Sequence, residues 1–203
     1  MLIQGEPNIG RLLLAHGAGA AMDSEFMDKI AAGLVAGGLQ VIRFEFPYMQ
    51  KRREDGKRRP PDRQPKLLEH YNHLLDELDP LAVPTFVAGK SMGGRMATMI
   101  VERADIASCF VYGYPFYATG KKDKPRTEHL TDLKTPVHIF QGTRDVMGNL
   151  ETVTGYTLSD AVSLYWLEDG DHDLKPRKMS GLTQDEHIAN AVESTLRICR
   201  RYS

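Results

Sequence analysis

A serine between two glycines stands in the segment whose residue types are best suited to nucleophilic chemistry. Gly89-Lys90-Ser91-Met92-Gly93 matches the pattern G-x-S-x-G, which is typical of a serine on a tight turn between a strand and a helix. The apolar run TFVA precedes the pattern, and GRMATMIVERA follows it with helical periodicity. Glycine at both flanking positions permits the close backbone approach that such a turn requires. We therefore predict that Ser91 is a nucleophile, with an ordinary glycine-rich turn as the alternative.

A serine hydroxyl needs a general base, and the base needs a carboxylate that orients it. Asp145 follows the apolar run VHIFQ, and His172 follows VSLYWL, so each lies at the C-terminal end of a predicted strand. The carboxyl ends of parallel strands meet at one edge of a sheet, where ligands bind. Ser91, Asp145 and His172 also occur in the chain order serine, acid, histidine that this arrangement requires. We predict that these three residues are catalytic.

Other acids and histidines are weaker candidates. The acids that crowd His172 in the sequence, and that keep the choice of Asp145 open, are Glu168, Asp169, Asp171 and Asp173. The histidines without a catalytic pattern are His70, His73, His129, His138 and His187. His138 lies within a strand and fits a core position, whereas His70 and His73 share a helix face that could suit a metal but fits a solvated surface better. We predict neither a metal site nor a cofactor.

Backbone N–H groups that could hold an oxyanion are expected at two places. One is the N–H group of Met92, directly after the predicted nucleophile, and the other lies in the turn after the first strand. That turn reads HGAGA over residues 16–20, and its small residues let the backbone approach a substrate carbonyl. We assign the second donor to Ala18, and we expect His16 to brace the turn rather than act as a base.

Short apolar runs that alternate with segments of helical periodicity must position these residues. The predicted strands are Arg11–Ala15, Gln40–Phe44, Thr85–Ala88, Ser108–Tyr114, Val137–Gln141 and Val162–Leu167, with residues 1–4 as a further edge. The first predicted helix is capped by Asp23 or Ser24, and the second opens at Pro65. The third runs from just after Ser91 to about Arg103, and the last from about Gln184 to Arg201. This regular alternation indicates an α/β fold with a doubly wound, mostly parallel sheet of about six or seven strands. Residues 1–203 are expected to form one domain, with residues 47–65 as a long, basic surface loop.

Composition excludes several other classes of protein. The chain is 41% hydrophobic and 26% charged, with a formal net charge of -1, so disorder and a global preference for nucleic acid are not expected. Cys109 and Cys199 do not form a disulfide framework. The sequence shows neither a signal peptide at its start nor an apolar run long enough to cross a bilayer. We therefore expect a cytoplasmic protein without a nucleic-acid or membrane partner, and we leave its oligomeric state open.

The segments LLLAHGAGA, GKSMGGRMA, GTRD and GDHDL together resemble the α/β-hydrolase superfamily. They are most similar to its compact, dienelactone-hydrolase-like branch, and the resemblance covers nearly the whole chain. It implies hydrolysis of an ester, a thioester or a related acyl compound without a cofactor. Dienelactone hydrolases use cysteine where this chain has Ser91, so their substrate is not carried over. About twenty residues separate Tyr114 from Val137, too few for the helical lid that many relatives carry there.

The substrate is expected to be a small acyl compound bound by loops at the C-terminal strand ends. We predict substrate contacts at Gly17, Tyr48, Tyr114 and Phe116. Basic side chains in two flanking loops could favour an anionic substrate; they are Lys51, Arg52, Arg53, Lys57, Arg58 and Arg59 in one loop and Lys121, Lys122, Lys124 and Arg126 in the other. Solvated loops without a substrate role are an equally open reading. A non-catalytic α/β-hydrolase-fold module that binds partners through these loops is the rival to the enzyme.

Overall fold

Seven strands form one sheet in the computed structural model, which describes residues 1–203. The strands are β1 (Leu2–Gln4), β2 (Gly10–Ala15), β3 (Leu39–Phe44), β4 (Thr85–Lys90), β5 (Ser108–Tyr112), β6 (Val137–Gly142) and β7 (Val162–Leu167). Their order across the sheet is β1-β3-β2-β4-β5-β6-β7. β1 is antiparallel to β3, and all other neighbours are parallel. The predicted doubly wound α/β sheet is therefore confirmed, with seven strands and no lid.

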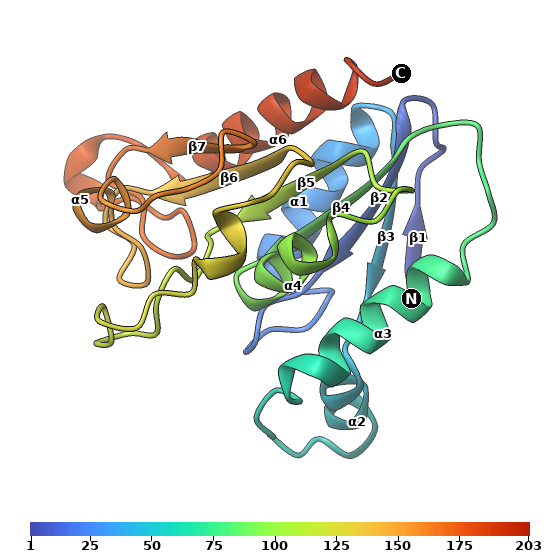
Figure 1. Ribbon diagram of the computed structural model, residues 1–203, viewed down its shortest axis with the longest axis horizontal. Helices are drawn as coiled ribbons and strands as arrows, with labels where there is room; N and C mark the ends of the chain where they lie inside the picture. The colour runs from blue at the N-terminus through green and yellow to red at the C-terminus, as the bar shows by residue number, and fades with distance from the viewer.

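Helices cover both faces of the sheet (Figure 1). They are α1 (Glu25–Ala36), α2 (Pro47–Asp55), α3 (Gln64–Asp76), α4 (Met92–Ile100), α5 (Leu150–Val153) and α6 (Gln184–Cys199), with short 3-10 turns at Glu128–Leu130 and Lys178–Ser180. α1 and α6 pack on one face, while α3 and α4 pack on the other. None of the helices is both long enough and apolar enough to cross a bilayer.

Strands buried on both faces explain the continuous apolar runs in the sequence. Along β2, Leu12 and Leu14 pack into the core beneath α1 and α6, while Leu13 packs into the core beneath α3 and α4. Successive side chains of a strand point to opposite faces of the sheet, so one run of leucines contributes to both cores. This sheet holds the C-terminal ends of β2, β4, β6 and β7 at one edge.

Residues 47–65 differ from the predicted surface loop, because their first half forms α2. Pro47 occupies the first turn, where a missing N–H costs nothing, and Gly56 ends the helix with φ of +71°. Tyr48 and Met49 are buried beneath the helix. The other side chains are polar, so the segment resembles a loop by composition although tertiary packing makes it helical.

Candidate active site

Ser91 sits between β4 and α4 with φ of 52° and ψ of −117°, a strained conformation for a residue with a side chain. A Cβ atom on Gly89 would lie 2.3 Å from the backbone of Gly93, and a Cβ atom on Gly93 would lie 2.5 Å from the carbonyl oxygen of His16. Real Cβ atoms do not approach backbone so closely. Glycine is therefore required at both flanking positions, because neither has room for a side chain. The close packing allows the turn to place Ser91 at the edge of the sheet.

A continuous chain of hydrogen bonds runs from Ser91 through His172 to Asp145. The Oγ atom of Ser91 lies 2.7 Å from Nε2 of His172, and Nδ1 of His172 lies 2.8 Å from Oδ2 of Asp145. A carboxylate can only accept, so Nδ1 carries the imidazole proton and Nε2 is left to accept the proton of the serine hydroxyl. The structure thus brings together the three predicted catalytic residues, in a geometry suited to proton transfer from the serine.

Asp145 is completely buried and is held by two further hydrogen bonds. Its Oδ2 accepts from Nε2 of Gln141 at 2.7 Å, and its Oδ1 accepts from the N–H group of Met147 at 2.7 Å. The amide of Gln141 also accepts from the N–H group of Tyr114 at 2.7 Å. Gln141 therefore ties the acid to the end of β5, a role that its position inside the run VHIFQ did not suggest.

Three of the four competing acids near His172 have other partners, namely Asp169, Asp171 and Asp173, which is paired with Lys90. Asp169 forms an ion pair with Arg177, and the hydrogen bonds from that guanidinium lower the pKa of Asp169 to about 2. Asp171 accepts the backbone N–H groups of Asp173 and Lys175, which shapes the loop. None of these carboxylates is bonded to the imidazole, so Asp145 is the acid that the geometry selects.

The backbone N–H groups near Ser91 that have no hydrogen-bond partner within the protein include the two predicted donors. These two belong to Ala18 and Met92, and both residues line a cavity of about 310 Å³ together with Ser91. Gly17 packs directly beneath this point, because a Cβ atom placed on it would lie 3.7 Å from Cβ of Ser91. The arrangement offers two free donors beside one hydroxyl, as stabilisation of an oxyanion requires.

His16 and Tyr48 brace the turn that carries Ala18. His16 is fully buried, its Nε2 accepts from the N–H group of Phe46 at 3.1 Å, and its Nδ1 lies 2.6 Å from the oxygen of Gly17. Burial lowers the pKa of His16, which keeps the ring neutral. The hydroxyl of Tyr48 donates to the oxygen of Ala18 at 2.9 Å. These contacts fix the turn from behind.

The aromatic residues predicted to contact substrate lie in the core instead of on the cavity wall. Tyr114 and Phe116 have no exposed surface, and Tyr48 is 2% exposed. Gly17 is also buried. An aromatic residue at the end of a strand can face either the cavity or the core, and the sequence does not distinguish the two. In this protein the rings support the loops around Ser91.

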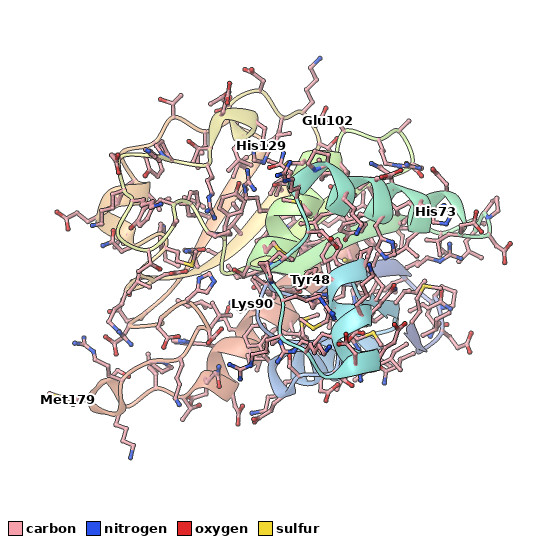
Figure 2. All side chains as sticks on the ribbon, turned by 90° about the horizontal axis from the view of Figure 1, so that it is seen from below. Tyr48, His73, Lys90, Glu102, His129 and Met179 are labelled. Atoms are coloured by element: carbon pink, nitrogen blue, oxygen red, sulfur yellow. The ribbon has the colours of Figure 1, made fainter.

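Lys90, directly before Ser91, was not predicted to have a role in the site. Its Nζ atom donates to the backbone oxygen of His172 at 2.7 Å and lies 3.1 Å from a carboxylate oxygen of Asp173. Burial lowers the pKa of Lys90, and the nearby carboxylates oppose that shift. Lys90 and Tyr48 are both labelled in Figure 2, toward the middle of that view of the molecule. Both approach Gly17: a Cβ atom placed on Gly17 would lie 3.6 Å from the side chain of Lys90, and the hydroxyl of Tyr48 lies 3.3 Å from the oxygen of Gly17.

The basic loops differ in how their charges are used. Arg53 is paired with Glu45 and Asp23, and Arg59 is paired with Asp55. Of the ten basic residues predicted to flank the site, Arg126 alone lines the cavity that contains Ser91. The positive charge nearest the site therefore comes from fewer residues than the sequence pattern implied.

His129 and His187 have structural partners. His129 lies 2.9 Å from the hydroxyl of Thr98, and burial lowers its pKa to about 4. His187 contacts the oxygen of Leu174 at 2.8 Å. No group of three or more His, Cys, Asp or Glu side chains is arranged to hold a metal ion.

Residues 8–200 match the family described as "Alpha/beta hydrolase domain". The match covers nearly the whole chain, so this protein belongs to that α/β-hydrolase family. The family, the fold and the neighbouring structures together support a hydrolase function. A comparison with curated protein sequences returned no match.

Solved structures with the same fold include an esterase domain from Rhodothermus marinus, which is 16% identical, has a TM-score of 0.68, and is aligned over 98% of this chain and 91% of its own. An alpha-beta serine hydrolase homologue from Coxiella burnetii is 17% identical, with a TM-score of 0.70 over 98% of this chain and 89% of its own. A monoacylglycerol lipase from Paleococcus ferrophilus is 13% identical, with a TM-score of 0.72 over 100% of this chain and 98% of its own. At these identities the likeness establishes the fold.

Proposed function

We propose that this protein is a serine hydrolase that cleaves a carboxylic ester or thioester through an acyl-enzyme. The observation that carries the proposal is the hydrogen-bond chain from Ser91 to His172 to Asp145, with distances of 2.7 and 2.8 Å, beside the two free N–H groups of Ala18 and Met92. A serine, a base, an orienting acid and an oxyanion site are the parts that acyl transfer needs.

In the first half of the reaction, Oγ of Ser91 attacks the substrate carbonyl while Nε2 of His172 takes its proton. The N–H groups of Ala18 and Met92 donate to the oxyanion, and Asp145 stabilises the imidazolium. The imidazolium then protonates the leaving alcohol or thiol as its bond to the carbonyl carbon breaks. In the second half, His172 takes a proton from water, the hydroxide adds to the acyl-enzyme, and Ser91 leaves with the proton returned.

The names of the neighbouring structures support esters as the first substrates to test, because they include esterases and a monoacylglycerol lipase. A small cavity and no lid favour a short acyl compound over a long lipid chain. Assignment to the dienelactone-hydrolase-like branch stays a prediction. Whether the substrate is an ester or a thioester is likewise left to the substrate panel described below.

Labelling with a fluorophosphonate probe tests the proposal directly. We expect the probe to modify Ser91 in the wild-type protein, and we expect no labelling of the Ser91→Ala variant. Ser24→Ala is the matched control, because Ser24 precedes α1 and its side chain makes no capping hydrogen bond. A panel of 4-nitrophenyl esters and coenzyme A thioesters then measures turnover. Wild-type protein that is inert to both probe and panel would favour the non-catalytic interaction module instead.

A further inference from the structure

We infer that Arg95 and Arg126 form a binding site for a carboxylate carried by the substrate, so that the preferred substrate is an anionic ester. This inference rests on the proposed function, since it concerns the cavity that contains Ser91. Both arginines line that cavity of about 310 Å³. Arg95 was not among the basic residues that the sequence pattern singled out.

Arg95 lies one helical turn after the proposed nucleophile. Its backbone N–H donates to the oxygen of Ser91 at 2.9 Å, as the first hydrogen bond of α4. Residues separated by four positions on a helix share a face, with about 5–6 Å between their Cβ atoms. A small substrate with its carbonyl group at Ser91 would therefore place a carboxylate on the guanidinium of Arg95 if only a few covalent bonds separate the two groups.

The guanidinium of Arg95 is half-buried and has no carboxylate partner. One of its terminal nitrogens donates to Oε1 of Gln64 at 3.0 Å, while its Nε is buried without any hydrogen-bond partner. Burial lowers the pKa of Arg95; the hydroxyl of Tyr114 opposes this shift, and the charge of Arg126 adds to it. The two arginines thus line one cavity, and neither side chain has a carboxylate partner.

Arg126 is fixed in place by its backbone. The hydroxyl of Tyr114 donates to the oxygen of Arg126 at 2.8 Å, and the N–H group of Arg126 donates to the oxygen of Phe116 at 2.7 Å. Its side chain forms no ion pair, and the lysines earlier in the same loop are exposed to solvent. The two buried aromatic residues therefore hold one arginine of a solvated loop against the cavity.

The acid that lines the same cavity cannot serve as the missing counter-ion. Asp62 accepts from the backbone N–H of Tyr48 at 2.9 Å and is paired with Lys66 at 2.8 Å. Two partly buried guanidinium groups without a carboxylate are unfavourable, because each raises the cost of the other's charge. A bound carboxylate removes that cost, and the planar fork of arginine matches its two oxygens.

Matched ester pairs test the inference and locate the carboxylate on the substrate. Mono-4-nitrophenyl adipate and 4-nitrophenyl hexanoate differ by a charge on the acyl part, whereas 4-acetoxybenzoate and 4-acetoxybenzamide differ by a charge on the alcohol part. We expect wild-type protein to prefer the charged member of at least one pair by about tenfold in kcat/KM. The preference should weaken in high salt, because the arginines are only partly buried.

Arg95→Gln and Arg126→Gln should each reduce this preference to about one, while Arg95→Lys should keep part of it. Lys121→Gln is the matched control, since it removes one charge from the same loop at an exposed position outside the cavity, and it should leave the preference unchanged. If Arg95→Gln does not fold, Arg126→Gln still decides, because that side chain is more weakly tied to its surroundings.

Binding separates failure of this inference from failure of the proposed hydrolase. We expect adipate, but not adipamide, to raise the Tm of the Ser91→Ala variant, and we expect this rise to vanish when Arg126→Gln is added. Esters hydrolysed without any charge preference, together with no rise from adipate, would overturn the anion site and leave the hydrolase standing. A rise that depends on Arg126 in a protein without ester turnover would support the anion site and overturn the hydrolase.

Discussion

The ammonium group of Lys90 donates a hydrogen bond of 2.7 Å to the backbone oxygen of His172, across 82 positions of sequence. The residue that precedes the proposed nucleophile therefore holds the loop that carries the proposed base. The side chain of Lys90 is 9% exposed, so the contact is shielded from water. The distance between Ser91 and His172 thus depends on a side chain that has no part in proton transfer.

Replacing Lys90 with methionine keeps the packing of the stem and removes the ammonium group. We expect kcat for ester hydrolysis to fall by about tenfold, because the His172 loop loses its tether and small misplacements are costly in catalysis. Tm should change little, because the protein no longer has to bury a charge, and this gain offsets the loss of the hydrogen bond to His172 and the ion pair with Asp173. Steady-state kinetics and thermal unfolding of the same samples measure the two effects.

Lys29→Met is a suitable control for that variant. Lys29 also makes ion pairs, with Glu25 and Asp185, but it lies on the surface of α1. Its loss should leave kcat unchanged. An unchanged kcat in Lys90→Met would show that the loop is held in place without the lysine.

Asp145→Asn keeps the size of the acid and removes its charge. The amide can donate to Nδ1 of His172, which favours the wrong tautomer and leaves Nε2 protonated. We expect kcat to fall on the order of a thousandfold or more. Glu168→Gln removes a charge from an exposed position shortly before His172 in the sequence and should lose less than about threefold. Equal losses in the two variants would reject Asp145 as the orienting acid.

The parts of this protein that could be predicted from sequence are those where the structure permits only one kind of residue. Strands covered on both faces must be apolar throughout, so β2, β5 and β6 stand out as short runs. The turn at Ser91 needs glycine on both sides because a Cβ atom at either position would lie within 3 Å of backbone atoms. The order of Ser91, Asp145 and His172 then follows from which strands end at the same edge.

The parts that could not be predicted depend on the direction of a side chain. Lys90 lies in the predicted turn and Gln141 ends a predicted strand, but nothing in those segments shows that their polar ends reach His172 and Asp145. Tyr114 faces the core, although its position just after β5 would equally suit a cavity wall. Helix α2 is amphipathic only through two buried residues, too few to give a helical pattern.

Gly93→Ala should destabilise the protein and abolish hydrolysis together. The added Cβ would lie 2.5 and 2.6 Å from the backbone oxygens of His16 and Ala15, and backbone cannot yield as a side chain can. We expect a loss of about 3 kcal/mol or more in the free energy of unfolding, measured in urea. Gly155→Ala is the control, because its Cβ would meet its nearest neighbour at 3.5 Å. A folded, active Gly93→Ala protein would contradict the close packing of β2 against the turn.

His138 should make the protein sensitive to acid. Its ring stacks on Phe110 with 5.4 Å between centroids, and its Nε2 is buried without a partner. Burial lowers the pKa of His138 to about 4, while the unfolded chain keeps a value of about 6.5. Between these two pH values the unfolded state binds more protons, so the free energy of unfolding falls as the pH falls.

His138→Phe keeps the stacking and removes the titration. We expect its free energy of unfolding, relative to wild type, to be constant above about pH 6.5 and to rise on the order of 1–2 kcal/mol by about pH 4, after allowance for partial exposure of the ring. Urea unfolding at a series of pH values measures the difference, in which the carboxylates common to both proteins cancel. His73→Gln, at an exposed position on α3, should run parallel to wild type throughout. If the difference between His138→Phe and wild type does not vary with pH, the prediction is wrong. That result would mean that the folded protein holds protonated His138 as well as it holds the neutral ring.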